Sequence, residues 1–123
     1  MNQQKQILLD NLASLWEKKK FTDVILVVGG TEMPAHKNVL VQLPVFAAMF
    51  ENPNTQESRS NRVEIPDFEP DVFEQFLRFI YTGELPSLEE YGTDLLAISD
   101  KYQAENLKEI CEGYLCNQIS ASN

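Results

Sequence analysis

The stretch DVILVVGGTEMPAH, residues 23–36, decides the fold of this chain. Residues 24–28 form an unbroken run of β-branched and aliphatic side chains, which predicts a strand with both faces covered. The two glycines that follow are typical of a two-residue hairpin turn, so residues 31–35 are expected to return as a second strand. Pro34 has no backbone N–H to donate, which places the second strand at an edge of the sheet.

Helical patterns flank this hairpin on both sides. In the segment QILLDNLASLWEKKK, residues 6–20, one stripe of the predicted helix is apolar and consists of Leu8, Leu12, Leu15 and Trp16. A broad apolar stripe on a helix that precedes the sheet must be covered by something. We therefore expect it to pack either on the chain's own core or on a second subunit.

The rest of the chain alternates polar segments with further helical patterns. Helices are predicted for residues 36–42, 45–50, 70–82, 94–102 (capped by Thr93) and 105–119, a strand for 62–67, and a polar loop for 51–61. The buried sides of the later helices are expected at Val72, Phe73, Phe76, Leu77, Ile80, Leu107, Ile110, Cys111, Tyr114 and Leu115. Early strands followed by many helices predict an α+β domain, with a small three-stranded sheet flanked by a helical bundle.

The composition favours one folded domain that binds a protein partner. The chain has 123 residues, of which 43% are hydrophobic, and this suits a single domain with its own core. The formal net charge of −9 argues against nucleic acid as a partner and fits a basic segment of a partner protein better. No apolar run is long enough to span a membrane, and the first residues lack the pattern of a signal peptide.

The two cysteines indicate a reducing compartment. Cys111 and Cys116 are five residues apart, so on a helix they point about 140° away from each other. This spacing disfavours both a disulfide between them and a shared metal ion. We interpret them as reduced, small apolar side chains, which implies a cytosolic or nuclear protein.

No pattern typical of catalysis is found in the sequence. Motifs for nucleophilic, phosphate or zinc chemistry are lacking, so we predict no enzymatic activity, no metal and no cofactor. The single histidine, His36, would need an acid or a metal beside it to act chemically. We interpret it as a structural residue at a strand-to-helix junction, bonded to backbone groups left free at the helix start. Asp23 and Lys37 border the predicted core and form either two exposed charges or a partly buried pair.

Several ordered stretches together resemble the BTB/POZ domain. They are FTDVILVVGG, PAHKNVL, PVFAAMF, NRVEIPDFEPDVFEQFLRFIYTG and DLLAISDKY, and the resemblance covers the chain from about Leu8 to Asn123. It extends in particular to the speckle-type POZ proteins, whose full-length members join a MATH domain to the BTB domain. The resemblance implies a dimerisation helix in residues 1–20 and a BTB/POZ core in residues 21–123, with no MATH domain.

The resemblance also implies a function. It points to a homodimer that serves as a substrate adaptor of a cullin-3 ubiquitin ligase, located in the nucleus or the cytoplasm. The alternative is a self-associating module of a transcriptional regulator that recruits a corepressor. The implied dimer contacts are Leu8, Leu12, Leu15, Trp16 and Val39, and Asp23 and Lys37 match a charged pocket near the dimer seam.

Cullin-3 is expected to bind beside the loop that follows AMF. The family inserts a hydrophobic residue and, two positions later, a glutamate, and the matching positions here are Thr55 and Glu57. Phe50, Asp100 and Tyr102 match positions near the same cleft. Because Thr55 is small and polar, we predict cullin binding roughly tenfold to hundredfold weaker than with a hydrophobic anchor. The loop is one residue longer than in the family, and the turn VQLP is one residue shorter.

Overall fold

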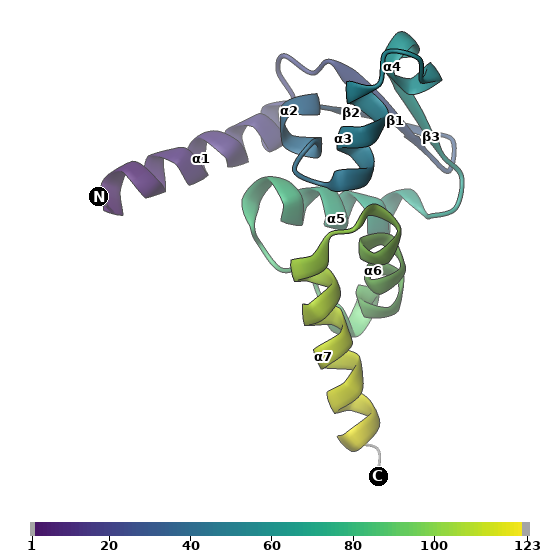
Figure 1. The fold of residues 1–123 in the computed structure, drawn as a ribbon. Helices are drawn as coiled ribbons and strands as arrows, with labels where there is room; N and C mark the ends of the chain where they lie inside the picture. Colours follow the sequence, from purple (N-terminus) through teal and green to yellow (C-terminus); the bar gives the residue numbers. More distant parts are fainter. Residues whose placement is uncertain (1, 122–123) are drawn as a thin grey trace.

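The computed structural model describes the backbone of residues 2–121 and the side chains of residues 3–117. It places this part of the chain in a three-stranded sheet and seven helices, with α5 between the sheet and the last two helices (Figure 1). The strands are β1 (Val24–Val28), β2 (Thr31–Ala35) and β3 (Arg62–Ile65). The helices are α1 (Asn2–Lys18), α2 (Lys37–Leu40), α3 (Pro44–Glu51), α4 (Gln56–Ser60), α5 (Pro70–Thr82), α6 (Leu88–Tyr102) and α7 (Glu105–Ala121). The predicted α+β class with a small three-stranded sheet is confirmed.

The first two strands form the predicted hairpin. They pair antiparallel, and their register sets Val24 opposite Ala35. The turn glycines, Gly29 and Gly30, have φ angles of 53° and 88°, a region that residues with a Cβ rarely adopt. A Cβ on Gly29 would also lie only 3.3 Å from the backbone carbonyl oxygen of Phe68. At Gly29 both the backbone conformation and the space favour glycine, whereas at Gly30 the backbone conformation alone favours it.

The third strand completes the sheet on the far side of β1. β3 runs parallel to β1, and the strand order is β2-β1-β3. β2 is thus an edge strand, which confirms the position predicted from Pro34. β2 and β3 lie on opposite sides of β1, so no tight turn can join them, and the connection between them passes through three short helices.

Only one face of β1 is closed by the rest of the chain. Along this strand Val24, Leu26 and Val28 are buried, whereas Ile25 and Val27 are half-buried. On the outer face an ion pair joins Arg62 of β3 to Glu32 of β2, with 2.8 Å between Nη1 and Oε2. The prediction that both faces are covered is wrong, because the helices lie over the inner face alone and the outer face carries exposed charged side chains.

Two short helices follow the hairpin, as predicted. α3 begins at Pro44, which occupies a first-turn position where a missing N–H leaves no helical hydrogen bond unmade. Between the helices, the N–H groups of Val41 and Leu43 donate to the carbonyls of Lys37 and Leu40 at 2.9 and 3.0 Å. The shortened VQLP segment is therefore a tight turn whose backbone groups are satisfied locally.

The polar stretch predicted as a loop contains one more helix, α4. Its start is capped by Thr55, and its end lies at Asn61, which has a φ of 56° and donates its N–H to the Glu57 carbonyl at 2.9 Å. None of the five residues of α4 is buried. The helix has no apolar stripe, so hydrophobic periodicity gave no signal for it.

The remaining helices follow the prediction except at the start of α6. α5 ends at Gly83, whose φ of 77° suits the glycine position after a helix. α6 begins five residues before the predicted cap Thr93, because the hydroxyl of Ser87 accepts a hydrogen bond from the Glu90 N–H at 3.3 Å. α7 packs along α6 over its first turns.

The core lies between the inner face of the sheet and the helices, and aromatic rings dominate its centre. The rings of Phe46 and Tyr102 are stacked, with centroids 4.6 Å apart and an interplanar angle of 6°. Phe73 meets Tyr102 edge-on at 5.9 Å. Both arrangements are favourable for aromatic pairs and add to the burial of their large apolar surfaces.

The predicted buried residues of the late helices are mostly buried. Val72, Phe73, Phe76, Leu77, Leu107 and Cys111 are buried, and Tyr114 and Leu115 are half-buried. Ile80 of α5 is only half-buried, whereas its neighbour Tyr81, which was not predicted, is buried at 3% exposure. In α7 the prediction for Ile110 is wrong, since this residue is 39% exposed.

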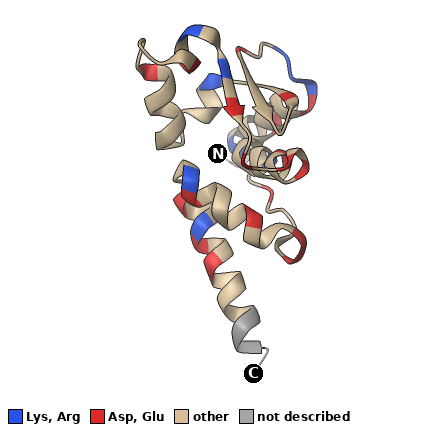
Figure 2. Cartoon of the chain, turned by 90° about the vertical axis from the view of Figure 1, so that its right-hand side faces the viewer, with Lys and Arg blue, Asp and Glu red and all other residues tan. Residues whose placement is uncertain are grey.

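The charged residues are spread over the surface. Figure 2 shows acidic residues on strands, helices and connecting loops alike. The ion pairs that join helices or loops, such as Arg78–Glu84 and Lys101–Asp67, are exposed, and such pairs add little stability. Within the described residues, no helix combines the length and the apolar character needed to cross a membrane.

Candidate protein interaction site

The first helix presents an apolar patch outside the core. The N-terminal half of α1 extends away from the rest of the chain (Figure 1), and residues 3–11 are exposed. Ile7, Leu8 and Leu9 are 51%, 63% and 41% exposed. We call these three residues the α1 patch. Consecutive helix positions lie about 100° apart, so these three side chains spread around the exposed half of the helix. Exposed large aliphatic side chains on a projecting helix are typical of a surface that binds another protein.

The C-terminal half of α1 packs on the chain's own core. Leu12, Leu15 and Trp16 are half-buried, and the Trp16 ring centroid lies 5.3 Å from that of Tyr81 in α5. The C-terminal half of the apolar stripe therefore packs on the chain's own core, and the N-terminal half is left free for a second subunit. The predicted dimer residue Leu8 lies in the free half, whereas the structure places Trp16 in a contact within the chain.

Val39, which is predicted as a dimer contact, is almost fully covered within the single chain. It is only 5% exposed in the single chain, so it has little surface to offer a second subunit. α2 is a single turn, and Val39 and Leu40 both lie on its buried side. The residue of this segment that does reach the surface is Val41, which is 37% exposed.

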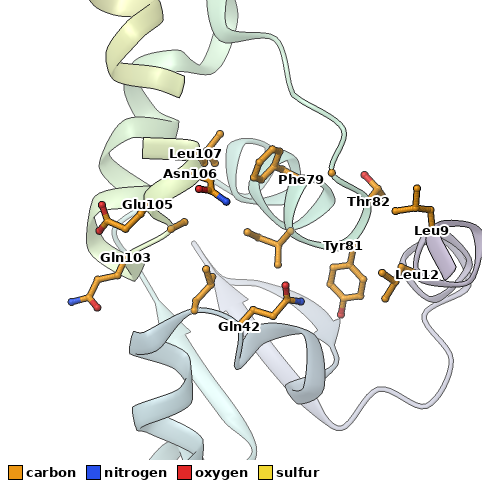
Figure 3. A pocket seen from close by; sticks show the side chains of 14 residues that line it. Leu9, Leu12, Gln42, Phe79, Tyr81, Thr82, Gln103, Glu105, Asn106 and Leu107 are labelled. Carbon is orange, nitrogen blue, oxygen red and sulfur yellow. The ribbon is translucent and has the colours of Figure 1, made fainter. Parts of the chain in front are cut away.

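A groove opens beside α1 (Figure 3). It has a volume of about 440 Å³ and lies between α1, the end of α5, the α2–α3 turn and the α6–α7 junction. Leu9 and Leu12 lie on one side of it, Gln103 and Glu105 on the other, and Gln42 lies between them. Because α1 forms one wall, any chain that packs on the α1 patch would also approach this groove.

His36 connects three separate segments by hydrogen bonds. Its Nδ1 lies 2.7 Å from the hydroxyl of Tyr81, its Nε2 lies 2.5 Å from the carbonyl oxygen of Lys20, and its backbone N–H donates to the Tyr81 hydroxyl at 2.9 Å. The ring makes no cap to α2, so its predicted partners at the helix start are wrong. The actual partners come from segments far away in sequence, which a local pattern cannot reveal.

Asp23 and Lys37 are joined, but not as an ion pair. The Asp23 carboxylate accepts a hydrogen bond from the backbone N–H of Lys37 at 2.8 Å. The Lys37 ammonium donates instead to the side-chain oxygen of Asn61 and lies 5.4 Å from the ring centroid of Phe50. Of the two alternatives left open by the sequence, the partly buried ion pair is not formed. The two residues are close, but Asp23 is exposed, and each side chain bonds to a backbone or amide group instead.

Thr55 is a helix cap, and its hydroxyl is used within the chain. Its Oγ1 donates to the carbonyl of Met49 at 2.6 Å and accepts from the N–H of Ser58 at 3.1 Å. The side chain is half-buried and turned toward α3. Glu57, two residues later in α4, is also half-buried. At this position the chain thus carries a structural cap.

The other residues predicted to face cullin-3 differ in their exposure and in the contacts they make within the chain. Phe50 and Tyr102 flank Phe46, at centroid distances of 6.1 and 4.6 Å. Tyr102 is 1% exposed, so its ring belongs to the core and cannot provide contact area. Asp100 is exposed but is turned toward α7, where its carboxylate lies 2.9 Å from the Lys108 ammonium.

Burial sets the protonation behaviour of several side chains. It raises the pKa of Tyr81 to about 12, opposed by the hydrogen bond from the His36 N–H, and it raises the pKa of Tyr102 to about 12 as well. Burial also raises the pKa of the Cys111 thiol, which keeps this residue neutral in the core. The other free cysteine, Cys116, is exposed.

Two residues near α1, Tyr81 and Phe21, were not predicted from the sequence. Tyr81 continues the stripe of Phe73 and Leu77 at a four-residue spacing, so periodicity contained a signal for it. Phe21 is 88% exposed in the segment between α1 and β1. No local pattern predicts an exposed phenylalanine, because this residue type is usually buried.

The sheet order, the helix arrangement and the sequence all agree with one family. Residues 12–119 match the family model described as the BTB/POZ domain. The chain belongs to the BTB/POZ family. It is also similar to a solved structure, the BTB domain of zebrafish PATZ1, with 27% sequence identity, a TM-score of 0.79 and 95% coverage of each chain.

BTB/POZ domains are protein–protein interaction modules that commonly self-associate as dimers. This general role suits the projecting α1 patch, which a BTB/POZ domain can cover with a second copy. The predicted family and fold are confirmed. The match is to the BTB/POZ family as a whole, and placement among the speckle-type POZ proteins stays a prediction.

Proposed function

We propose that this BTB/POZ domain is a homodimeric interaction module in which α1 of one copy packs against α1 of the other. The observation that carries the proposal is the α1 patch, Ile7 to Leu9, exposed on the projecting half of the helix. Burying one large aliphatic side chain contributes roughly 1.5–3 kcal/mol before the entropy cost of association. Two-fold symmetry uses each contact twice, so a small patch can support a stable dimer.

Leu8→Asp tests the dimer. We expect the dimer dissociation constant to rise by about a hundredfold or more, because each copy then loses a leucine contact and would bury a carboxylate. Sedimentation equilibrium measures the constant, and circular dichroism checks that the chain stays folded. Leu8 is preferred over the half-buried Leu12 and Leu15, whose replacement would also disturb the chain's own core.

Gln3→Asp is the matched control for that variant. It adds the same charge to the same helix, at an exposed position about 140° around the axis from Leu8. It should leave the dissociation constant unchanged within about twofold. A Leu8→Asp chain that remains as dimeric as the control would refute the proposed interface.

We further propose that the dimer serves as a substrate adaptor of a cullin-3 ubiquitin ligase in the nucleus or cytosol. The support is the resemblance to the speckle-type POZ proteins, together with the position of Glu57 in α4 beside the end of α3. Because the Thr55 hydroxyl is bonded within the chain, this residue supplies no apolar anchor. We therefore expect binding roughly tenfold to hundredfold weaker than with an apolar anchor.

A titration with the N-terminal region of cullin-3 tests this second step. Glu57→Arg is expected to weaken binding by about tenfold or more through loss of an interfacial carboxylate. Glu109→Arg makes the same charge change on exposed α7 and should have little effect. If the wild-type dimer shows no binding at about 100 μM, a weak affinity on the free-energy scale, the cullin proposal fails while the dimer proposal stands.

The groove beside α1 favours one alternative function. Its volume of about 440 Å³ and its leucine wall suit a peptide segment, as expected for a transcriptional regulator that recruits a corepressor. Gln42→Arg, in the middle of this groove, should weaken binding of a corepressor peptide without affecting the cullin titration. A dimer that binds such a peptide in the groove and ignores cullin-3 would favour this alternative.

A further inference from the structure

The segment between α1 and β1 contains two residues in an unfavourable backbone conformation. Lys19 and Phe21 have φ angles of 50° and 60°, in the left-handed region that residues with a Cβ avoid. Phe21 is 88% exposed, so packing of its side chain does not hold this conformation in place. We call residues 19–21 the α1 hinge. At Lys19 the backbone N–H donates to the Leu15 carbonyl at 3.0 Å, as at an ordinary helix end, and the half-buried side chain lies over Trp16. At Phe21 the side chain is exposed, so the part of the hinge beyond Lys19 must be held by another contact.

That contact is the hydrogen bond to His36. The carbonyl of Lys20, between the two unfavourable residues, lies 2.5 Å from Nε2 of the His36 ring. A carbonyl can only accept, so Nε2 carries the proton and donates it. His36 is 8% exposed, whereas Lys20 is exposed, so this bond is only partly shielded from competing water.

The Tyr81 hydroxyl holds the His36 ring in position. In the neutral ring Nδ1 is then an acceptor, so the Tyr81 hydroxyl, 2.7 Å away, donates to it. The same hydroxyl oxygen accepts from the His36 backbone N–H at 2.9 Å. We call this chain of bonds from Tyr81 through His36 to Lys20 the relay. Donors and acceptors match at each of its steps.

The relay also connects to α1 through aromatic contacts. The ring of Tyr81 lies against Trp16, with centroids 5.3 Å apart. The Lys19 ammonium, from the hinge, lies over the Trp16 ring at 3.6 Å. Tyr81 thus touches α1 with its ring and holds the hinge through its hydroxyl, so one residue of α5 controls both ends of the connection.

We infer that His36 and Tyr81 are positioning residues that fix the angle at which α1 leaves the core, and that they thereby set the affinity between two copies of the chain. The inference rests on the proposed role of α1 in the dimer and adds what regulates that contact. It also gives a role to the buried His36, which belongs to no catalytic motif and does not cap a helix.

The length of α1 makes dimerisation sensitive to this angle. Leu8 is ten residues from the end of the helix at Lys18, a span of about 15 Å. Each 10° of rotation at the hinge therefore moves Leu8 by about 3 Å. In a two-fold dimer both copies shift, and apolar side chains lose much of their contact once they separate by an ångström. Small rotations at the hinge are thus enough to break the apolar contact.

Tyr81→Phe is the first test, because it removes the hydroxyl and keeps the ring beside Trp16. The dimer dissociation constant, measured by sedimentation equilibrium, is expected to rise by about tenfold, which corresponds to 1.4 kcal/mol. Trp16 is the only tryptophan of the chain. Its fluorescence, recorded on dilute monomer, should shift and its anisotropy should fall as α1 becomes more mobile.

Ile98→Val is the control for general destabilisation. Ile98 is buried in α6, and neither the relay nor α1 includes it. This variant should lower the denaturant midpoint while leaving both the dissociation constant and Trp16 fluorescence unchanged. Equal changes in the two variants would show that Tyr81→Phe acts only through stability, and the inference would be overturned.

His36→Gln and His36→Leu provide the second test. The glutamine amide reaches the place of Nε2 and can still donate to the Lys20 carbonyl, whereas leucine cannot. Glutamine should keep the dissociation constant within about threefold of wild type, and leucine should raise it by about tenfold. Equal constants for the two variants would refute a role for this bond.

The results also separate this inference from the dimer proposal. A wild-type chain that dimerises, together with unaltered association in Tyr81→Phe and His36→Leu, overturns the inference alone. A wild-type chain that is monomeric at about 100 μM overturns both, since there is then no affinity for the relay to set.

Discussion

Hydroxyl groups of single residues decide where two helices of this chain begin. Thr55 and Ser87 each accept a hydrogen bond from an N–H three residues later, at 3.1 and 3.3 Å. Such caps typically contribute about 1 kcal/mol each. In α4 the cap must offset the lack of any buried residue, which explains why Thr55 is used inside the chain rather than at a surface.

Gln103 is a residue whose replacement should stabilise the protein. It follows α6, is exposed and has a φ of 59°. This left-handed conformation is unfavourable for a residue with a Cβ and costs glycine nothing. Gln103→Gly is expected to raise the free energy of unfolding by about 0.5–1 kcal/mol, measured by urea denaturation. Glu109→Gly, at an exposed position inside α7, should lower it by a similar amount.

Helix boundaries and long-range contacts differ in how far the sequence predicts them. Gly83 and Pro44 mark helix boundaries by backbone chemistry alone. The end of α5 before Gly83 is predicted correctly, and α3 begins at Pro44, one residue before its predicted start. The relay from Tyr81 to His36 joins residues 45 positions apart. No periodic pattern encodes such a contact, because only the folded chain brings the two side chains together.

At the scale of elements, α1 is divided between two tasks. Its C-terminal half is held by Trp16 against α5, and its N-terminal half carries the exposed α1 patch. Its apolar stripe is continuous, so periodicity predicts the helix correctly but cannot say how far the core extends beneath it.

Two glycines in different helical contexts should respond oppositely to alanine. Gly113 lies inside α7, and a Cβ there would meet nothing within 4 Å. Gly113→Ala should therefore raise the free energy of unfolding by about 1 kcal/mol. Gly83→Ala should lower it by about 1 kcal/mol, because φ is 77° at this position.

Thermal unfolding followed by circular dichroism measures both effects. The two variants make the same change of side chain, so their opposite signs isolate the backbone conformation as the cause. A stabilising Gly83→Ala would contradict the left-handed conformation assigned to the end of α5.

At the scale of the whole molecule, the buried tyrosines make stability depend on alkaline pH. Tyr81 and Tyr102 have pKa values raised to about 12 in the folded state, against 10.0 when exposed. Their neutral forms are favoured in the core, so the stability they contribute is complete below pH 10 and is lost as pH rises through 12. The expected loss is on the order of 2 kcal/mol per tyrosine.

Urea denaturation at a series of pH values from 9 to 12, the range in which phenols titrate, measures this loss. The unfolding midpoint should fall above pH 10, while tyrosine ionisation, followed by ultraviolet absorbance, lags behind that of a model peptide. Tyr102→Phe should flatten the pH dependence. A midpoint that is independent of pH in this range would contradict the burial of both hydroxyls.

The hairpin, the α+β class and most helix boundaries follow from the sequence, because glycine, proline and the spacing of apolar residues act locally. The sequence also identifies α1 as an apolar helix in need of a partner and predicts the BTB/POZ family. The packed fold is needed to see that Trp16 and Val39 are used inside the chain, that Thr55 is a cap, and that His36 is bonded to the α1 hinge. These roles depend on distances between segments far apart in sequence, and such distances exist only after the core has packed.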